Sequence, residues 1–266
     1  MLSTAVLMVV LAQAPQKLQW EPRVDLPVSG ALAAGWLLSE FAFKKQLAPA
    51  TCRWCATNGF DTAVRSLFNP GLTPSANGIP GPDMASNLVG FIGVPLVALG
   101  VDGLLAWKAG AFLETWPIDA VLILEAMLVT QGLNQTVKFA AGRGRPYTVG
   151  ATPELLADSH RADNNLSFFS GHSSFVFSLV AGAATVAELR GYKYSWLIWV
   201  IGIPLAASTA VLRLAADKHW TSDVLLGSAV GLGVGVLFPR LLHARLGPVR
   251  LRLAPLGNGL GLSGQF

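Results

Sequence analysis

Three cations in the stretch KFAAGRGRP, residues 138–146, are the first residues that could do chemistry. Lys138, Arg143 and Arg145 follow one of the most apolar segments of the chain. Lys and Arg flank membrane helices on the cytoplasmic side, so the stretch could be a topology signal. It could also be an anion site, because Arg offers a planar fork of donors and Lys offers a compact charge.

Two histidines stand at spacings that suit nucleophilic chemistry. His219 and Asp223 are four residues apart, so on a helix both side chains would lie on one face. Asp223 could then accept the proton of one imidazole nitrogen and leave the other lone pair free to attack. His172 supplies a second imidazole, which suits protonation of a leaving oxygen. His160 and His243 have no such neighbours, and we interpret them as loop and surface residues.

Further groups could hold a tetrahedral oxyanion beside these imidazoles. Lys138, Arg145 and Arg213 could converge on one phosphate, which would make the cation-rich stretch part of a site. Ser170 is a natural helix N-cap, and Gly171 permits close approach of the backbone. A helix that begins there would aim free N–H groups at the anion.

These residues all fall at the ends of apolar segments. The expected spans are 87–107, 118–137, 170–189, 194–212 and 222–242, with a shorter segment at 28–43. Because consecutive spans alternate in direction, the candidate residues share one membrane face. The last span carries small residues at 227–229, 231, 233 and 235, which let membrane helices pack closely. The sequence therefore predicts an all-α membrane bundle of about five to six transmembrane helices, with the active site at one membrane face.

Composition supports a membrane protein. Of the 266 residues, 52% are hydrophobic and 13% are charged, whereas an average globular protein is nearer to a quarter charged. The net charge is +4. The basic residues are scattered between apolar runs and form no basic face, so no nucleic acid partner is expected. The expected partner is the lipid bilayer. The sequence carries no signal for an oligomeric state.

The chain is expected to form one membrane domain over residues 28–243. Before it, residues 1–14 contain an apolar core and the small-residue pattern Ala-Gln-Ala, which is typical of a secretory signal peptide. An uncleaved N-terminal anchor is the alternative. After the domain, residues 244–266 form a C-terminal tail, for which disorder is preferred to a short strand.

Cys52 and Cys55 form a C-x-x-C pair in a long polar loop, residues 44–84. Such a pair can be a redox motif, half of a zinc site or a local disulfide. The chain has no second C-x-x-C for a four-cysteine zinc site and no βαβ pattern around this one. A structural disulfide is preferred, with two reduced cysteines as the alternative.

The candidate residues together resemble the signature of the type 2 phosphatidic acid phosphatase superfamily, which includes vanadium haloperoxidases and bacterial acid phosphatases. The family pattern is Lys, six residues, Arg-Pro; then Pro-Ser-Gly-His; then Ser-Arg, five residues, His, three residues, Asp. The matching residues here are Lys138, Arg145, Pro146, Ser170, Gly171, His172, Arg213, His219 and Asp223. Phe169 stands where the family has proline, and Leu212 stands where it has serine. The resemblance covers roughly residues 87–242.

The resemblance implies a phosphatase that acts on lipid phosphates or pyrophosphates, such as phosphatidate, phosphatidylglycerol phosphate or undecaprenyl pyrophosphate. His219 would attack phosphorus and form a phosphohistidine, Asp223 would orient it, and His172 would protonate the leaving group and later activate water. The phosphoryl oxygens would be held by Lys138, Arg145, Arg213, Ser170 and the Gly171 amide. No metal or other cofactor is implied. Arg143 lies outside the motif, and we interpret it as a headgroup or loop contact.

Three other functions are alternatives. An exported acid phosphatase of small soluble phosphomonoesters would use the same site. A vanadium haloperoxidase would also share it, although the apolar composition argues against that function. A non-catalytic lipid-binding membrane protein would need no imidazoles, and the intact histidines argue against it.

Three topologies are compatible with the sequence. An uncleaved, cytoplasmic N-terminus with a spanning 28–43 segment gives six spans and a site that faces outward. A cleaved signal with that segment on the surface gives five spans and again an outward site, whereas a cleaved signal with the segment spanning turns the site to the cytoplasm. The first two place Cys52 and Cys55 where a disulfide can form and the arginine-bearing tail inside. The expected location is therefore a bacterial-type cell membrane, with the site facing the periplasm or outside.

Overall fold

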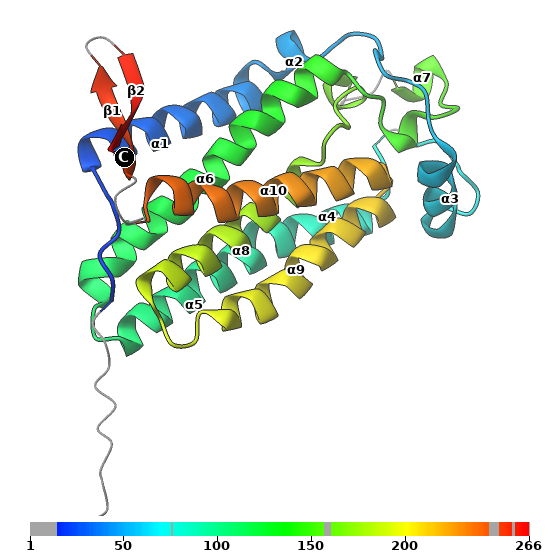
Figure 1. Ribbon diagram of the computed structural model, residues 1–266. Coiled ribbons are helices and arrows are strands. Elements are labelled where there is room, and N and C mark those ends of the chain that lie inside the picture. The colour runs from blue at the N-terminus through cyan, green and yellow to red at the C-terminus, as the bar shows by residue number, and fades with distance from the viewer. Residues whose placement is uncertain (1–14, 76, 157–160, 245–249, 257–258, 266) are drawn as a thin grey trace, which may run out of the picture.

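The computed structural model describes residues 15–75, 77–156, 161–244, 250–256 and 259–265, so the expected signal or anchor segment lies outside the described residues. Figure 1 shows long helices that run between two ends of the molecule. These helices are α1 (Pro22–Leu37), α5 (Val94–Lys108), α6 (Phe112–Ala141), α8 (Gly171–Arg190), α9 (Trp196–Ala215) and α10 (Thr221–Leu242). The predicted helical bundle is confirmed.

Shorter elements extend this bundle at one end. α4 (Pro80–Leu88) runs through the π-helical turn Val89–Gly93 into α5, and the π-helical turn Leu38–Ala42 and α2 (Lys44–Leu47) continue α1. α3 (Gly59–Phe68) and α7 (Pro153–Leu156) lie at the right-hand end in Figure 1, and α2 lies at the upper edge near the end of α6. The 3-10 turns Pro146–Thr148 and Arg161–Asp163 complete the connection between α6 and α8. The long polar connections therefore gather at one end.

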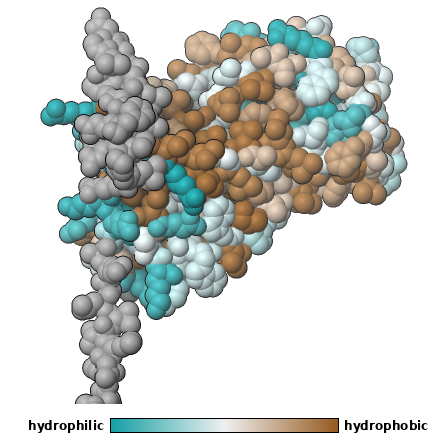
Figure 2. Space-filling view, in the orientation of Figure 1, coloured by the Kyte–Doolittle hydropathy of each residue, from teal (hydrophilic) through white to brown (hydrophobic). Residues whose placement is uncertain are grey.

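Four helical segments are long and apolar enough to cross a membrane: Pro80–Lys108, Gly171–Arg190, Trp196–Ala215 and Thr221–Leu242. The expected span at 118–137 lies within α6, which is 30 residues long but carries buried Asp119 and Glu125. Figure 2 shows hydrophobic surface over the middle of the bundle and hydrophilic residues toward the left-hand end. The chain is an integral membrane protein.

The segment expected at 28–43 packs along the bundle. Its helix, α1, begins at Pro22 and runs beside α6 (Figure 1). The Trp36 ring lies 6.0 Å from the Phe175 ring of α8, and the Leu32 side chain lies against Gly132 of α6. The segment therefore lies along α6 and contacts α8.

α8 is the central helix, buried on nearly all sides, and it packs closely against α10. The close packing predicted for the last span is confirmed at the glycines of α10 that face α8, which are Gly227, Gly231 and Gly235. A Cβ atom at Gly231 would lie only 2.5 Å from the carbonyl oxygen of Ser174. At Gly233, by contrast, a Cβ atom would meet nothing within 4 Å. Only glycine, whose side chain is a hydrogen atom, lets α10 approach the backbone of α8 at these three positions.

Replacing Gly231 by alanine should lower the thermal unfolding midpoint of the purified protein in detergent. The added methyl group overpacks against the α8 backbone, which cannot move as a side-chain end can, at a cost of about 1–3 kcal/mol. Gly233→Ala is the matched control, and its midpoint should stay the same or rise, because alanine favours helix. Equal midpoints for the two variants would contradict the close packing.

The C-terminal tail differs from its prediction. β1 (Arg250–Leu256) and β2 (Gly259–Gln265) form an antiparallel hairpin, with Arg250 opposite Gln265 and Leu256 opposite Gly259. The preferred disorder was wrong because two weakly alternating segments, close in sequence, satisfy one another's backbone hydrogen bonds. The hairpin lies at the end of the bundle away from α3 (Figure 1).

Candidate active site

The candidate residues lie at the same end of the bundle, as their positions in the sequence predict. The C-terminal ends of α6 and α9 and the N-terminal ends of α8 and α10 all point toward the right-hand end in Figure 1. His219 lies in the connection between α9 and α10, and only 4% of its surface is exposed.

The tautomer of His219 follows from its hydrogen bond. Nδ1 of His219 lies 2.8 Å from the backbone oxygen of Ser167. A carbonyl oxygen only accepts, so Nδ1 carries the proton and Nε2 keeps its lone pair. Nη1 of Arg145 lies 3.4 Å from that Nε2 atom. A nucleophilic nitrogen therefore stands beside a guanidinium that can hold a phosphoryl group.

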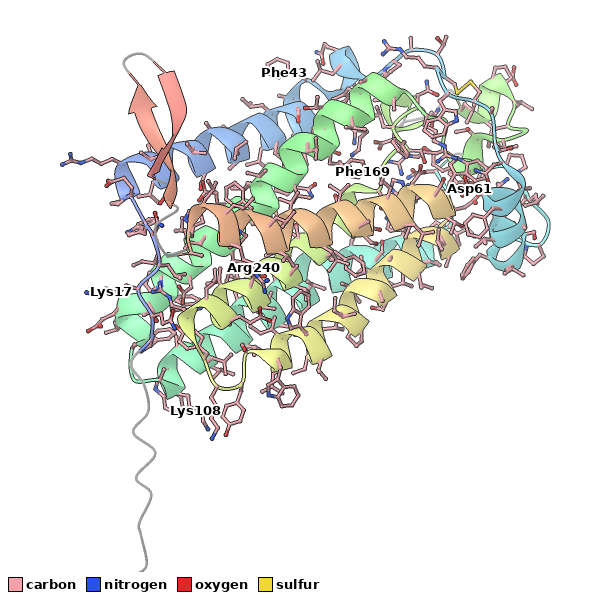
Figure 3. All side chains as sticks on the ribbon, in the orientation of Figure 1. Lys17, Phe43, Asp61, Lys108, Phe169 and Arg240 are labelled. Carbon is pink, nitrogen blue, oxygen red and sulfur yellow. A yellow bond between two sulfur atoms is a disulfide. The ribbon has the colours of Figure 1, made fainter. Side chains whose placement is uncertain are left out.

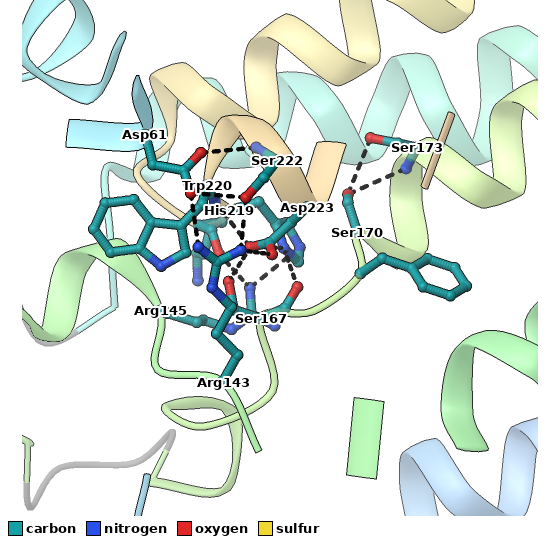
Figure 4. A network of polar contacts seen from close by, with 12 residues as sticks. Asp61, Arg143, Arg145, Ser167, Ser170, Ser173, His219, Trp220, Ser222 and Asp223 are labelled. Carbon is teal, nitrogen blue, oxygen red and sulfur yellow. Dashed lines mark hydrogen bonds and ion pairs between the residues drawn. The ribbon is translucent and has the colours of Figure 1, made fainter. Parts of the chain in front are cut away.

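Asp223 does not make the hydrogen bond to His219 that the spacing predicted. Its Oδ2 atom is 3.8 Å from Nδ1 of His219 and instead accepts from Ser167 Oγ at 2.5 Å and from the Trp220 amide at 3.0 Å. Asp223 thereby caps the N-terminus of α10 and holds Ser167, whose carbonyl orients the imidazole (Figure 4). Sequence reasoning missed Ser167 because the group that acts is a backbone carbonyl, which any residue could supply.

The three proposed phosphate ligands, Lys138, Arg145 and Arg213, are called here the phosphate-site cations. All three are buried. Arg145 donates from Nε to the backbone oxygen of Asp163 at 2.8 Å and from Nη1 to that of Lys218 at 2.9 Å. Arg213 donates to Asp83 and, at 2.9 Å, to Ser86 Oγ. These bonds fix the guanidinium groups at the helix ends.

The phosphate-site cations act electrostatically on the imidazole of His219. Burial, followed by the charges of these three cations, holds the pKa of His219 well below its ordinary value of 6.5. His219 is therefore neutral at neutral pH and in mildly acidic solution. A neutral imidazole with its lone pair on Nε2 is the form that can attack phosphorus.

Additional charged residues surround the phosphate-site cations, and the sequence did not reveal their part in the site. Asp83 accepts from Arg213 and lies 3.5 Å from the ammonium of Lys218, whose pKa burial lowers to about 8. On the other side, Lys44 lies 2.7 Å from Asp163 and 2.5 Å from Glu40. Asp83, Lys44 and Glu40 were missed because they come from helical turns distant in sequence, where a lone charge gives no spacing signal.

The start of α8 has the predicted form. Ser170 is its N-cap, and its Oγ accepts from the Ser173 amide at 3.3 Å. A Cβ atom at Gly171 would lie 3.0 Å from Asn134 Oδ1 and 3.5 Å from Lys138 Nζ. The missing side chain therefore lets the end of α6 and its lysine approach the free amides of the helix.

His172 follows directly, and its partner comes from the long helix that contains α4. Its Nε2 atom lies 2.7 Å from Asn87 Oδ1, and its ring centre lies 4.7 Å from that of Phe91 in the π-helical turn. The Asn87 oxygen accepts, so Nε2 carries the proton. The charges of Arg213, Lys138 and Arg145 act on this imidazole as they act on His219.

Arg143, interpreted from the sequence as a headgroup or loop contact, makes a loop contact. It is 1% exposed and bonds to Asp61 of the 44–84 connection at 2.7 Å and to Asp223 at 2.5 Å. The sequence did not reveal that these two carboxylates are its partners. His243 is also buried rather than at the surface, with Nε2 3.5 Å from Glu125 Oε2. His160 lies outside the described residues.

Cys52 and Cys55 are joined in a disulfide, the arrangement preferred from the sequence. Their loop pairs with the stretch after α6, where the Trp54 carbonyl accepts from the Gly144 amide at 3.2 Å. Within the described ranges, no three His, Cys, Asp or Glu side chains come together as a metal site would require.

Parts of the chain are similar to known proteins. Residues 119–246 match the PAP2 superfamily. A lipid A 1-phosphatase of Porphyromonas gingivalis is 32% identical over 125 residues, which are 47% of this chain and 24% of that protein. A PA-phosphatase related-family protein of Dictyostelium discoideum is 30% identical over 125 residues, 44% of this chain and 46% of that protein. The chain thus spans between a quarter and a half of the length of these relatives.

A solved structure is also similar. It is a transmembrane PAP2 type phosphatidylglycerolphosphate phosphatase from Bacillus subtilis, with a TM-score of 0.47 and 19% sequence identity. The similarity covers 79% of this chain and 92% of that one.

Proposed function

We propose that the chain, whose residues 119–246 match the PAP2 superfamily, is a membrane phosphatase that hydrolyses lipid phosphates or pyrophosphates without a metal. The observation that carries the proposal is the neutral His219. Its Nδ1 donates a hydrogen bond to the Ser167 carbonyl, and the lone pair of its Nε2 lies beside Arg145. The position of this imidazole at one end of an apolar bundle favours a substrate whose phosphate lies at the membrane surface. The Porphyromonas relative is a lipid A 1-phosphatase, which agrees with a lipid phosphate as the substrate.

The proposed reaction has two displacement steps at phosphorus. In the first, Nε2 of His219 bonds to phosphorus as the bond to the leaving oxygen breaks, and His172, as the imidazolium, gives that oxygen its Nδ1 proton while its Nε2 proton stays bonded to Asn87. The product is a phosphohistidine. In the second step, His172 takes a proton from water, the water oxygen bonds to phosphorus, and inorganic phosphate leaves with His219 restored. Nδ1 of His219 keeps its proton throughout and donates it in a hydrogen bond to the Ser167 carbonyl.

The phosphoryl oxygens are proposed to bind the phosphate-site cations, Ser170 and the free amide of Gly171. The cations that act at this end are Lys138, Arg145, Arg213, Lys44 and Lys218, and the carboxylates are Glu40, Asp83 and Asp163. Positive charge therefore exceeds negative charge among these groups, which favours an anionic substrate. Arginine forks at fixed positions suit a transition state with charge spread over the equatorial oxygens.

The site is proposed to face the periplasm or the outside. The Cys52–Cys55 disulfide lies on the side of the site, which favours an oxidising compartment. Figure 3 shows Lys17 and Lys108 at the end away from Asp61, where the positive-inside rule expects cations to be cytoplasmic. Since α1 runs from that end to the site, this orientation puts residues 15–21 in the cytoplasm, as in the first of the three topologies.

Purified protein in detergent with EDTA should release inorganic phosphate from a panel of phosphatidate, phosphatidylglycerol phosphate and undecaprenyl pyrophosphate. Vanadate should inhibit, because it fills a phosphoryl site.

Turnover confined to a soluble phosphomonoester such as p-nitrophenyl phosphate would favour the acid phosphatase instead. Halide oxidation with vanadate would favour the haloperoxidase, and binding without turnover would favour a lipid-binding protein. Intact cells should release phosphate from lipid supplied to the outer leaflet if the site faces outward.

A further inference from the structure

A buried ion cluster joins a loop helix to the start of the last membrane helix. Asp61 of α3 is fully buried, and its oxygens accept from Arg143 Nη2 at 2.7 Å, from the Ser222 amide at 2.8 Å and from Ser222 Oγ at 2.7 Å. Arg143 and Asp61 are 82 residues apart in the chain. Two carboxylates, Asp61 and Asp223, therefore share one guanidinium (Figure 4).

The guanidinium of Arg143 is held in one orientation. Nη1 donates to Asp223 at 2.5 Å and to Ser222 Oγ at 2.8 Å, while Nη2 donates to Asp61. Its carbon lies 4.3 Å from the centre of the Trp54 ring and 5.7 Å from that of Trp220. A planar fork between two carboxylates and two aromatic faces is an arrangement that lysine could not reproduce.

The cluster reaches the nucleophile through Ser167. The Ser167 amide donates to the Arg143 carbonyl at 3.0 Å, and Ser167 Oγ donates to Asp223 at 2.5 Å. The Ser167 carbonyl in turn accepts from Nδ1 of His219. Arg143 thus fixes the acceptor of the imidazole twice, through its own backbone and through Asp223.

We propose that Asp61 and Arg143 are positioning residues for the nucleophile, and that they act on His219 through Asp223 and Ser167. This inference rests on the proposed function, because it assigns a part in the attack at phosphorus. Neither residue touches the phosphate site itself. Asp61 comes from the long loop before α4, so that loop has a part in catalysis as well as in covering the end of the bundle.

The proposal predicts that removing a charge from the cluster changes the pKa of His219, which a merely structural role would not do. His219 is faced by Lys138, Arg145, Arg213 and His172, by its neighbour Lys218, and by Asp223 with Arg143 behind it. Without the charge of Arg143, the Asp223 carboxylate stabilises the imidazolium, so the pKa of His219 rises. Without the charge of Asp61, Arg143 neutralises Asp223 more fully, so the imidazolium is less stable and that pKa falls.

The experiment compares Asp61→Asn, Arg143→Gln and Arg143→Lys with the unchanged protein, using the lipid phosphate that it hydrolyses best. Each variant should lose about 10²-fold in kcat with KM within about twofold, because misplacing a nucleophile affects the transition state more than ground-state binding. The acidic limb of the kcat/KM profile should move by about half a pH unit or more, upward for Arg143→Gln and downward for Asp61→Asn. Arg143→Lys should keep the limb near its original pH, because it keeps the charge.

Arg65→Gln is the matched control. It breaks another buried ion pair of α3, in which Arg65 bonds to Asp217 at 2.7 Å, and it should lower stability without moving the acidic limb. Limbs that stay in place, or that move in the same direction for Asp61→Asn and Arg143→Gln, would overturn the proposal. Failure of the proposed function is a separate result, since in that case the unchanged protein itself would release no phosphate.

Discussion

Replacing His219 by alanine should abolish phosphate release, with a loss in kcat of about 10⁴-fold or more. Removing the nucleophile of a two-step displacement removes the intermediate altogether, and losses of this scale follow from loss of the central group of a catalytic unit. Substrate binding should persist, because the phosphate-site cations are untouched. Phosphate release under EDTA measures the loss, and a labelled substrate quenched in alkali should leave acid-labile phosphate on the unchanged protein and none on the variant.

His243→Ala provides the comparison for His219→Ala. His243 is a buried histidine at the other end of the bundle, where it lies near Glu125 and far from the phosphate-site cations. This variant should keep its activity once folded, so a general effect of losing a histidine is separated from loss of the nucleophile. Turnover by His219→Ala at a rate near that of the unchanged protein would contradict the proposed mechanism.

Replacing His172 by alanine should give a different kinetic pattern. Loss of a general acid and base costs about 10²- to 10⁴-fold for a lipid substrate, whose alkoxide leaves poorly without a proton. With p-nitrophenyl phosphate the leaving group needs no proton, so the first step survives while activation of water fails. A burst of nitrophenolate equal to the amount of enzyme should appear, followed by slow turnover as phosphohistidine accumulates.

Asn87→Ala separates the imidazole of His172 from its support. It removes the acceptor 2.7 Å from His172 Nε2 but leaves the ring, so the lipid activity should fall less than in His172→Ala and no full burst should appear. A linear time course for His172→Ala with p-nitrophenyl phosphate, without trapped phosphoenzyme, would show that His172 has no part in the second step.

The sequence predicted those parts of the site that depend on spacing along one helix or across one turn. Ser170 as an N-cap needs only its residue type and the apolar run that follows. The close contact of α10 with α8 follows from glycines four residues apart, which share one face of a helix. The common location of the motif residues follows from alternation of the spans, because each lies at a helix end.

What the sequence could not provide were the partners that come from elsewhere in the chain. Asp61 and Asp83 lie in α3 and α4, on either side of a stretch rich in proline and glycine, and nothing in their spacing points to Arg143 or Arg213. The signal that existed was indirect: an apolar chain with a third cation, Arg143, beside its motif needs a buried carboxylate to pair with it. The spacing of His219 and Asp223 was sound as geometry, but it led to the wrong hydrogen bond because a nearer backbone carbonyl competed for the same proton.

The ion cluster of Asp61, Arg143 and Asp223 also has a consequence for biogenesis. Asp61 and Arg143 both precede Asp223 in the chain, so the cluster can close only after α10 has been made and has packed against the other helices. The acceptor of His219 is set only at that step. On the proposed function, competence to cleave phosphate therefore arises only once α10 is in place.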